Sequence, residues 1–489
     1  MPDLLKRLRA RPARLLLAAS LLSVAAAFAA EGAYRLFLRS RAAAGARHGV
    51  FELYAVGDSS MRGLPFYISS PEIVSLLLGD KLGGRELAVN NLAEGGSSIY
   101  TQALKAARTL KYRDRSNPAA VLIYAGHAEN ITAHKSRASL LPRAYEKFKT
   151  RVLSHSLLFS KLFFDIEKAL LFYGVRDLGH YEFYLRRTIE AALDAGAVPI
   201  IATLGSNLEV EPSVGDRYLP SAEEVLKAFG AEERGETAKA LAEYTRLYAG
   251  AAPEEAGVLR PYLAYRIGRC LQSAGKPEAA LARFAEALEN DPYPLRSKPS
   301  QNAIVRRLAG EYSIQLVDAE ALFMENSPGK VPGEELFVDT MHPGPAGTLL
   351  LSRAFAQRLA ELLHDRVRND LRDPLAIYES PRRDITFREG PYVAAGVCLL
   401  WSGQGNLPIP DCLKLADKNF RKALSMSPGD RLARIGLRVT AVSKKNRYII
   451  PWDVYKWYNT KRRYYELRRQ FTDEEMAEAD KFLAKWEKP

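Results

Sequence analysis

The sequence predicts an α/β fold with a parallel sheet covered on both faces, joined to an all-helical insertion and an all-helical C-terminal region. Short apolar runs rich in Val, Ile and Tyr alternate with longer amphipathic stretches over roughly the first 215 residues. Between about 220 and 294, and again after 366, only helical patterns occur. Strands that alternate with helices along a chain form parallel sheets with helices on both faces.

Five runs are the predicted strands of the sheet, and they cover 51–57, 86–92, 119–125, 197–203 and 314–323. The carboxyl ends of parallel strands meet at one edge of a sheet, where functional residues gather. The first run ends in Gly57-Asp58-Ser59-Ser60. A turn after a strand favours these residue types for conformational reasons alone, so a nucleophilic role for Ser59 needs support from elsewhere in the chain.

The N-terminal 38 residues predict a membrane anchor or a signal segment. Residues 1–13 are basic, and residues 15–30 carry no charge. Basic residues before an apolar run place the N-terminus in the cytoplasm and the remainder outside it. Apolar residues resume at 34–38, which favours an uncleaved anchor over 14–38, with Arg14 and Arg35 reaching the two interfaces. The alternative is a signal peptide cleaved at the A-x-A site Ala27-Phe28-Ala29. Either way, the bulk of the protein is expected in the periplasm or outside the cell.

The formal net charge of +13 is concentrated in two short segments. Residues 1–14 contribute +4 and residues 443–471 contribute +7, so the rest of the chain is nearly neutral. A general nucleic-acid surface is therefore excluded. The aromatic and basic segment 448–471 suits a membrane interface, an anionic glycan, or an amphipathic helix packed on its own domain.

The helical segment 220–294 has the residue spacing of a tetratricopeptide repeat. The matching small and large packing positions are Gly268, Leu271, Gly275, Ala280, Phe284, Ala287 and Pro292. Small residues let two antiparallel helices approach closely, and Phe284 fills the space between them. A weaker match occurs in the C-terminal region, with 392–401 as the partner helix of 416–428. Cys398 and Cys412 flank the loop between these two helices and could form a disulfide.

The stretch 337–359 supplies the partners that a serine nucleophile needs. Asp339 lies three residues before His342, directly ahead of an amphipathic helix. A short turn can hold the carboxylate against one imidazole nitrogen, which fixes the tautomer and stabilises the imidazolium ion. Because a serine hydroxyl is almost never ionised at neutral pH, it needs such a base. Ser59, His342 and Asp339 are the predicted catalytic residues.

At this point the sequence resembles the SGNH, or GDSL-like, hydrolase family, over roughly 50–215 and 295–362. The four family blocks appear in order as GDSS, NLAEGGSS, YAGHAEN and DTMH. The resemblance implies a flavodoxin-like three-layer α/β/α fold and an oxyanion hole that includes the amides of Ser59 and Gly96. It also implies esterase, lipase or carbohydrate acetyl esterase activity, and some members transfer O-acetyl groups on exported polysaccharides. It implies no cofactor, and no residues have metal-ligand spacing.

The third block departs from the family pattern of Gly-x-Asn. Here Ala128 stands where the family has the Asn that donates to the oxyanion, and losing one such donor costs on the order of 10²–10³ in rate. Asn130 is the candidate replacement donor. His127 and Glu129 could shape the pocket or be exposed polar residues at a strand end, and Asn207 could line the cleft or only form a turn.

These observations predict six segments and two alternative functions. The segments are a basic segment 1–13, an anchor or signal 14–38, the hydrolase domain in two parts at 48–215 and 295–365, the helical insertion 220–294 and the helical C-terminal region 366–489. The first function is a serine esterase or O-acyltransferase acting on an ester, most plausibly an acetyl group on a cell-envelope glycan. The second is a membrane-tethered assembly factor with weak catalysis, whose repeats bind a protein partner.

Overall fold

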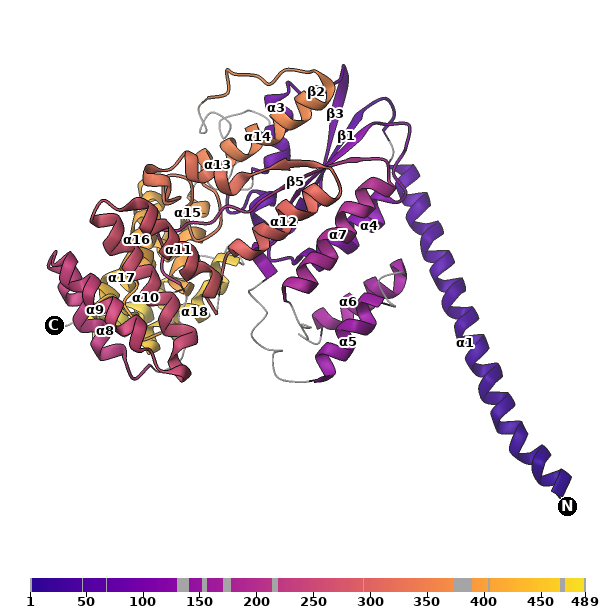
Figure 1. Ribbon diagram of the computed structural model, residues 1–489, viewed down its shortest axis with the longest axis horizontal. Coiled ribbons are helices and arrows are strands. Elements are labelled where there is room, and N and C mark those ends of the chain that lie inside the picture. The colour runs from indigo at the N-terminus through magenta and orange to yellow at the C-terminus, as the bar shows by residue number, and fades with distance from the viewer. Residues whose placement is uncertain are drawn as a thin grey trace.

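The computed structural model describes residues 2–45, 47–66, 68–129, 140–151, 156–169, 177–212, 219–292, 294–372, 389–402, 405–466 and 471–487. Figure 1 shows a long N-terminal helix that projects away from the body, a sheet flanked by helices, and a helical part at the opposite end. The predicted fold class, a parallel sheet covered on both faces with additional helical regions, is confirmed.

The sheet has six strands in the order β2-β3-β1-β4-β5-β6. The strands are β1 (Phe51–Gly57), β2 (Lys81–Leu82), β3 (Arg85–Asn91), β4 (Ala119–Tyr124), β5 (Val198–Ala202) and β6 (Gln315–Val317). All neighbouring strands are parallel except β2, which pairs antiparallel with β3 at one edge. β1 therefore lies in the interior of the sheet, and every residue of β1 is buried, as expected for a strand covered on both faces.

Two helical layers cover the sheet, and each encloses its own apolar core. One layer holds α3 (Ser70–Leu77), α13 (Ala319–Glu325) and α14 (Pro345–Leu363), which bury Val74, Phe323 and Phe355. The other holds α4 (Ile99–Leu110), α7 (Leu178–Asp194) and α12 (Pro299–Glu311), which bury Ile189 and Leu308 among others. Side chains alternate between the two faces of a strand, so β1 and β4 feed both cores.

The predicted fifth strand is correct only in its first part. β6 ends at Val317, and the run continues as the helix α13. The reason is Asp318, whose carboxylate accepts a hydrogen bond from the amide of Ala321 and so caps the helix. The two-residue strand β2 was not predicted, because it is too short to leave a hydrophobic pattern.

The predicted helical insertion is present as two antiparallel helix pairs. Its helices are α8 (Ala222–Glu233), α9 (Thr237–Gly250), α10 (Pro253–Ser273) and α11 (Pro277–Asn290). A Cβ atom placed on Gly268 of α10 would lie 2.7 Å from the ring of Phe284 on α11, so only glycine fits there. The small-against-large packing that the spacing predicts is therefore found, while membership of the tetratricopeptide class stays a prediction.

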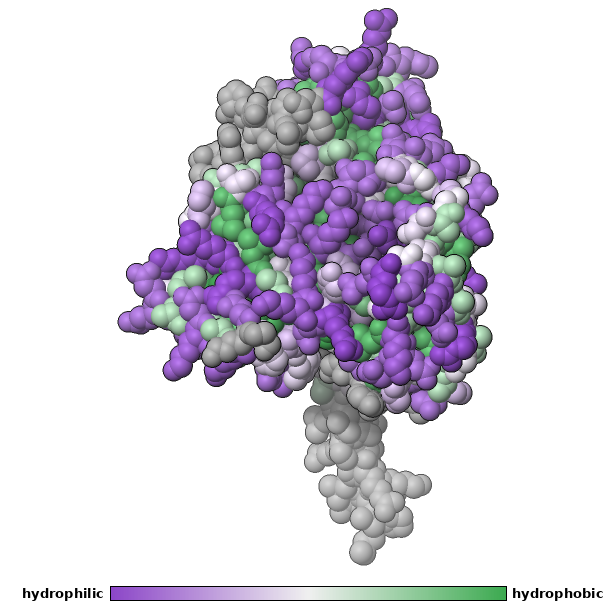
Figure 2. Space-filling view, turned by 90° about the vertical axis from the view of Figure 1, so that its left-hand side faces the viewer, coloured by the Kyte–Doolittle hydropathy of each residue, from purple (hydrophilic) through white to green (hydrophobic). Residues whose placement is uncertain are grey.

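The C-terminal region is helical throughout its described part. Its helices are α15 (Gly390–Ser402), α16 (Pro410–Met426), α17 (Arg431–Lys445), α18 (Trp452–Glu466) and α19 (Asp473–Glu487). Phe420 of α16 fits between Gly396 and Gly436, because a Cβ on either glycine would lie within 2.6 Å of its ring. Figure 2 looks onto the helical side of the molecule, where the surface is mostly hydrophilic with scattered apolar patches.

Two further predictions concern this region and the tail. No disulfide joins Cys398 and Cys412, so the predicted possibility of a disulfide between them is wrong for this structure. Burial in an apolar core raises the pKa of the Cys412 thiol. In the tail 448–471, Val454, Tyr455 and Tyr458 of α18 are buried in the C-terminal core. The interpretation as an amphipathic helix packed on its own domain is thus the one that the structure favours.

Buried charges join the insertion to the C-terminal region. Arg266 of α10 lies 3.5 Å from carboxylate oxygens of both Glu211 and Asp411. Glu211 in turn accepts hydrogen bonds from the backbone amides of Asp411 and Cys412 at the start of α16, both at 2.9 Å. Burial, followed by the charge of Asp411, raises the pKa of Glu211 to about 7. Removing one partner of a buried ion pair is costly, so these contacts hold the two helical parts together.

The N-terminal helix α1 (Pro2–Ala44) includes a stretch, Ala19–Ala44, that is long and apolar enough to cross a membrane. Among the described residues no other helix meets that criterion. The same stretch would also fit a signal sequence, so the choice between anchor and signal stays open. Two further helices, α5 (Leu140–Arg151) and α6 (Leu157–Ala169), lie between β4 and α7 in the sequence, and α6 contacts α1.

Candidate active site

Ser59 lies directly after the carboxyl end of β1, at the first position of the short helix α2 (Ser59–Arg62). The turn is tight, because a Cβ on Gly57 would lie 2.3 Å from the carbonyl oxygen of Tyr124. Asp58 caps α2, and its Oδ1 accepts a hydrogen bond from the amide of Ser60 at 3.0 Å. These constraints fix the serine at the edge of the sheet where functional residues are expected.

Asp58 has a second function that the sequence did not reveal. Its Oδ2 accepts hydrogen bonds from the backbone amides of Gly126 and His127, at 3.2 and 2.9 Å. These residues follow β4, the neighbour of β1 in the sheet. The carboxylate is fully buried, so it joins the turn that carries Ser59 to the third sequence block. The GDSS motif signals only the cap, because an Asp before a helix start is a typical capping residue.

The structure brings Ser59, His342 and Asp339 together in one hydrogen-bonded chain. Ser59 Oγ lies 2.8 Å from Nε2 of His342, although 283 residues separate the two in sequence. Nδ1 of His342 lies 2.7 Å from Oδ2 of Asp339. The other carboxylate oxygen of Asp339 accepts the backbone amides of Met341 and His342, at 2.9 and 2.8 Å. This is the order of contacts that activates a serine hydroxyl.

The ion pair between Asp339 and His342 sets the charge of both groups. Burial alone lowers the pKa of His342, but the charge of Asp339 and the hydrogen bond to it outweigh burial and raise this pKa above its ordinary value. Burial raises the pKa of Asp339, but His342 and the two backbone amides outweigh it, so the net shift is downward. Asp339 therefore stays ionised, and the imidazolium form of His342 is stabilised, as a general base requires.

Three polar side chains hold the loop that carries Asp339. The side-chain amide of Asn207, which follows β5, donates to the carbonyl oxygen of Asp339 at 3.0 Å, and its own Oδ1 accepts the amide of Glu209. Ser60 Oγ donates to the carbonyl oxygen of Met341 at 3.2 Å. Asn419, on α16, donates to the carbonyl oxygen of Val338 at 2.9 Å. Asn207 thus forms a turn, which is one of the two roles that the sequence allowed. It also holds the backbone of Asp339 in place.

The second sequence block, NLAEGGSS, lies beside the turn that carries Ser59. The amide of Glu94 donates to the carbonyl oxygen of Gly57 at 3.1 Å. Gly96 has a φ of +69°, a left-handed conformation that favours glycine. A Cβ on its neighbour Gly95 would lie 3.9 Å from the Cβ of Ser59 and 2.8 Å from Leu64. The block therefore reaches the serine, and the assignment of the Gly96 amide to the oxyanion hole stays a prediction.

The third block is buried, which rules out the interpretation of His127 and Glu129 as solvent-exposed residues at a strand end. His127 is fully buried, and its Nδ1 accepts the amide of Ser297 at 3.2 Å. Burial lowers the pKa of His127 to about 4, so its ring is neutral at neutral pH. Glu129 accepts a hydrogen bond from the amide of Ile99, at the N-terminus of α4, where a carboxylate is favourable. Ala128 is buried in the same turn, and Asn130, the predicted replacement donor, lies outside the described residues.

Within the described ranges, no group of three or more His, Cys, Asp or Glu side chains is placed to hold a metal ion. The residues that the sequence reasoning missed are Asp58 in its bridging function and Asn419. Asn419 carries no signal in a single sequence, because its contact depends on how the C-terminal region packs against the sheet.

Comparisons with known proteins give a limited result. No protein-family model matches the chain, and no curated protein matches it significantly. Solved structures that are similar include a member of the lipolytic G-D-S-L family from Veillonella parvula, with 12% identity, coverage of 63% of this chain and 97% of that chain, and a TM-score of 0.31. A lipase/acylhydrolase from Enterococcus faecalis has 14% identity, coverage of 64% and 97%, and a TM-score of 0.31. An acetylxylan esterase from Geobacillus stearothermophilus has 14% identity, coverage of 64% and 94%, and a TM-score of 0.30.

These structures are named as a G-D-S-L family lipolytic protein, a lipase/acylhydrolase and an acetylxylan esterase. Their identities and TM-scores are too low to carry the activity of any of them over to this chain. The chemistry therefore has to be inferred from the chain's own side chains.

Proposed function

We propose that the protein is a serine esterase or O-acyltransferase in which Ser59 is the nucleophile, His342 the general base and acid, and Asp339 the group that orients His342. The observation that carries the proposal is the continuous chain of contacts, with Asp339 Oδ2 2.7 Å from His342 Nδ1 and His342 Nε2 2.8 Å from Ser59 Oγ. A helix cap would account for the contact between Asp339 and His342. It would not account for the contact between the imidazole and Ser59, which lies far away in the sequence.

The reaction proceeds in two balanced steps. Ser59 Oγ attacks the ester carbonyl carbon while His342 Nε2 takes the hydroxyl proton, and the resulting imidazolium then gives that proton to the leaving alcohol. The acyl group is now bonded to Ser59. In the second step, His342 removes a proton from the acceptor as the acceptor attacks the acyl carbon. The imidazolium then returns that proton to Ser59 Oγ while the bond between Oγ and the acyl carbon breaks. Water as acceptor gives hydrolysis, and a sugar hydroxyl gives acyl transfer.

The oxyanion of each tetrahedral intermediate needs preorganised donors. The amides of Ser59, at the start of α2, and of Gly96 are the proposed donors. Gly95 and Gly96 together support this assignment, because neither presents a side chain between the second block and Ser59. Asn130 is the proposed third donor. It would take the role of the Asn that the family pattern has at the position of Ala128.

The substrate class that we propose is an acyl ester, most simply an acetyl ester on a glycan of the cell envelope. It follows from the proposed location, with α1 as an anchor and the body outside the cytoplasm. The contacts of Glu31 support a structural role for the end of α1 that joins the body of the protein. Its carboxylate accepts hydrogen bonds from Ser156 Oγ and from the amides of Leu157 and Leu158 at the start of α6, at 2.7, 3.1 and 2.9 Å.

Hydrolysis of p-nitrophenyl acetate tests the proposal. We expect Ser59→Ala to lower kcat by about 10⁴-fold or more, with unchanged thermal unfolding, because the nucleophile is lost and the fold is not. Adding an acetylated oligosaccharide and following acetyl release or transfer distinguishes water from sugar as acceptor. A Ser59→Ala protein that retains full activity would exclude this mechanism.

A further inference from the structure

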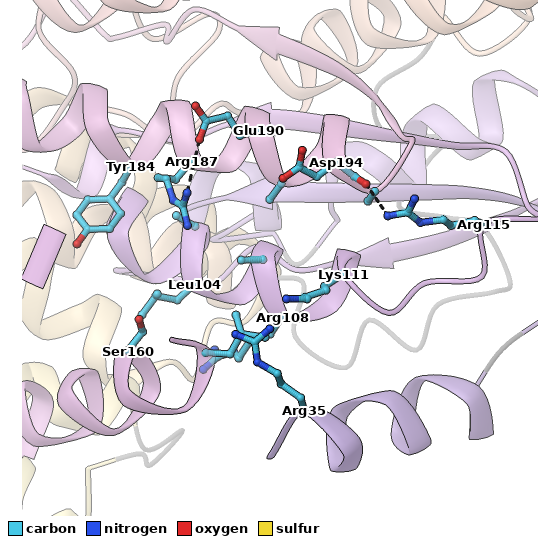
Figure 3. Close-up of a pocket in the computed structure, with 15 residues that line it drawn as sticks. Arg35, Leu104, Arg108, Lys111, Arg115, Ser160, Tyr184, Arg187, Glu190 and Asp194 are labelled. Atoms are coloured by element: carbon cyan, nitrogen blue, oxygen red, sulfur yellow. Dashed lines mark hydrogen bonds and ion pairs between the residues drawn. The ribbon is translucent and has the colours of Figure 1, made fainter. Parts of the chain in front are cut away.

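A cavity lies away from Ser59, on the side of the molecule where α1 joins the body. It has a volume of about 250 Å³ and is enclosed by α1, α4, α6 and α7. Five cations line it, against the two carboxylates of Glu190 and Asp194. The cations are Arg35, Arg108, Lys111, Arg115 and Arg187. Figure 3 shows Arg35, Arg108 and Lys111 together on one side and Arg187 with Glu190 on the other.

Neither carboxylate forms an ion pair with Arg108 or Lys111 on the α4 side. Glu190 lies 3.8 Å from Arg187 and also accepts the hydroxyl of Tyr312, while Arg115 donates to the carbonyl oxygen of Asp194. Arg35 is paired with Glu31 on its own helix. In the described part of the chain, neither Arg108 nor Lys111 forms an ion pair.

Arg108 is the most informative of these side chains. Its Nη1 atom is buried and has no hydrogen-bond partner among the described residues. A buried guanidinium nitrogen without an acceptor is costly, and an anion in the cavity would remove that cost. The Lys111 side chain is exposed overall, but partial burial and then the neighbouring charge of Arg35 lower the pKa of its ammonium group, against the opposite effect of Glu31 and Asp194. A bound anion would stabilise both cations.

The position of the cavity along α1 indicates where the anion comes from. The uncharged run of α1 ends at Ala30, and Arg35 lies five residues further on, about 7.5 Å along a helix axis. Because the hydrocarbon core takes about 20 helical residues, a span that begins with the uncharged run at residue 15 ends close to Arg35, at the level of the phosphate groups. Exposed apolar side chains flank the cavity. Leu36 and Phe37 lie beside Arg35 on α1, and Leu162 and Ile166 lie on α6.

We propose that this cavity binds the phosphodiester headgroup of an anionic phospholipid in the leaflet from which the body of the protein emerges. Arg108 and Lys111 contact the phosphate, Arg35 closes the site from the anchor, and the apolar residues of α6 rest at the headgroup boundary. The lipid would fix the orientation of the body relative to the membrane. The proposal requires that α1 stays attached, and it is independent of the chemistry at Ser59.

Native mass spectrometry of the full chain in a non-ionic detergent tests the proposal. On titration with phosphatidylglycerol, we expect one lipid retained per chain, and about tenfold or greater weakening of that binding in Arg108→Ala/Lys111→Ala. The matched control, Arg234→Ala/Lys239→Ala, removes two exposed cations from the insertion and should bind like the wild type. Turnover of p-nitrophenyl acetate should be the same in all three proteins, which separates this result from the proposed catalysis.

Three outcomes would overturn the proposal. The first is wild-type affinity for phosphatidylglycerol in the Arg108→Ala/Lys111→Ala variant. The second is equal retention of phosphatidylcholine, which would show that the cations do not select an anionic lipid. The third is displacement of phosphatidylglycerol by an equal concentration of glycerol 1-phosphate or of an acidic oligosaccharide, which would show that the cavity takes a soluble anion.

Discussion

Asn419, on α16 of the C-terminal region, donates a hydrogen bond from its side-chain amide to the carbonyl oxygen of Val338 at 2.9 Å. Val338 directly precedes Asp339, so a helix outside the sheet domain holds the loop that carries the carboxylate. A second contact joins the sheet domain to the C-terminal region. The ring of Phe66, near the turn that carries Ser59, packs edge-to-face against the ring of Tyr392 on α15, with ring centroids 5.5 Å apart. The C-terminal region therefore supports the site as well as lying beside it.

Asn419→Ala should lower kcat about tenfold and leave KM nearly unchanged. The substitution removes the donor to Val338 and lets the Asp339 loop shift, and small misplacements of catalytic groups are costly. The loss of a buried hydrogen bond should also lower the free energy of unfolding by about 1–2 kcal/mol. Steady-state kinetics with p-nitrophenyl acetate and chemical denaturation measure the two effects. Asn290→Ala is the control, because Asn290 makes a similar bond to a helix carbonyl on the exposed side of α11. Equal kcat values in both variants would show that Asn419 does not position the site.

The rate of acylation should depend on pH through His342. The imidazole must be unprotonated to accept the serine proton, and its pKa is raised above the ordinary value of about 6.5. We therefore expect kcat/KM to increase with pH, with a midpoint above pH 6.5. Below that midpoint the protonated imidazole should lower kcat/KM. In Asp339→Asn the charge that raises this pKa is lost, so the midpoint should move to lower pH while the maximal rate drops by about 10⁴-fold. A pH–rate profile of both proteins provides the measurement, and a midpoint that stays fixed in the variant would contradict the assignment of Asp339.

His127 should make the fold sensitive to mild acid. Its pKa is lowered by burial to about 4 in the folded protein, whereas an unfolded chain has a His pKa near 6.5. Between these values the unfolded state binds more protons, so stability is lost as the pH falls from about 6.5 to 4, by on the order of 2–3 kcal/mol. In His127→Asn this component of the pH dependence should disappear, whatever the cost of the substitution at pH 7. Denaturation curves at a series of pH values give the slopes, and identical slopes for the two proteins would argue against a neutral buried ring.

Two glycines of α10 should respond in opposite ways to the same substitution. Gly268→Ala places a methyl group 2.7 Å from the Phe284 ring and should cost about 1–3 kcal/mol through overpacking. Gly257→Ala meets no atom within 4 Å and should stabilise the helix by up to about 1 kcal/mol, because alanine has the higher helix propensity. Thermal unfolding of both variants tests the packing of α10 on α11. A Gly268→Ala protein as stable as the wild type would show that this helix pair is looser than described.

The sequence predicted the parts of the molecule whose signals are local. Strands β1, β3, β4 and β5 were recognised as apolar runs, and Ser59, Asp339 and His342 as short motifs at strand or helix ends. The boundary between β6 and α13 was missed, because one residue, Asp318, turns an apolar run from strand into helix. Asn419 and the bridging function of Asp58 could not be predicted. Their hydrogen bonds join segments 81, 68 and 69 residues apart, and no pattern along the chain records such contacts.

Labelling with a fluorophosphonate, mapped by mass spectrometry of the digested protein, tests the central claim most directly, because the reagent reacts with an activated serine. The account predicts that Ser59 is the modified residue in the wild type, and that His342→Ala lowers the labelling rate by at least about 10³-fold. Modification of Ser59 at the same rate in both proteins, or of a different serine, would contradict it.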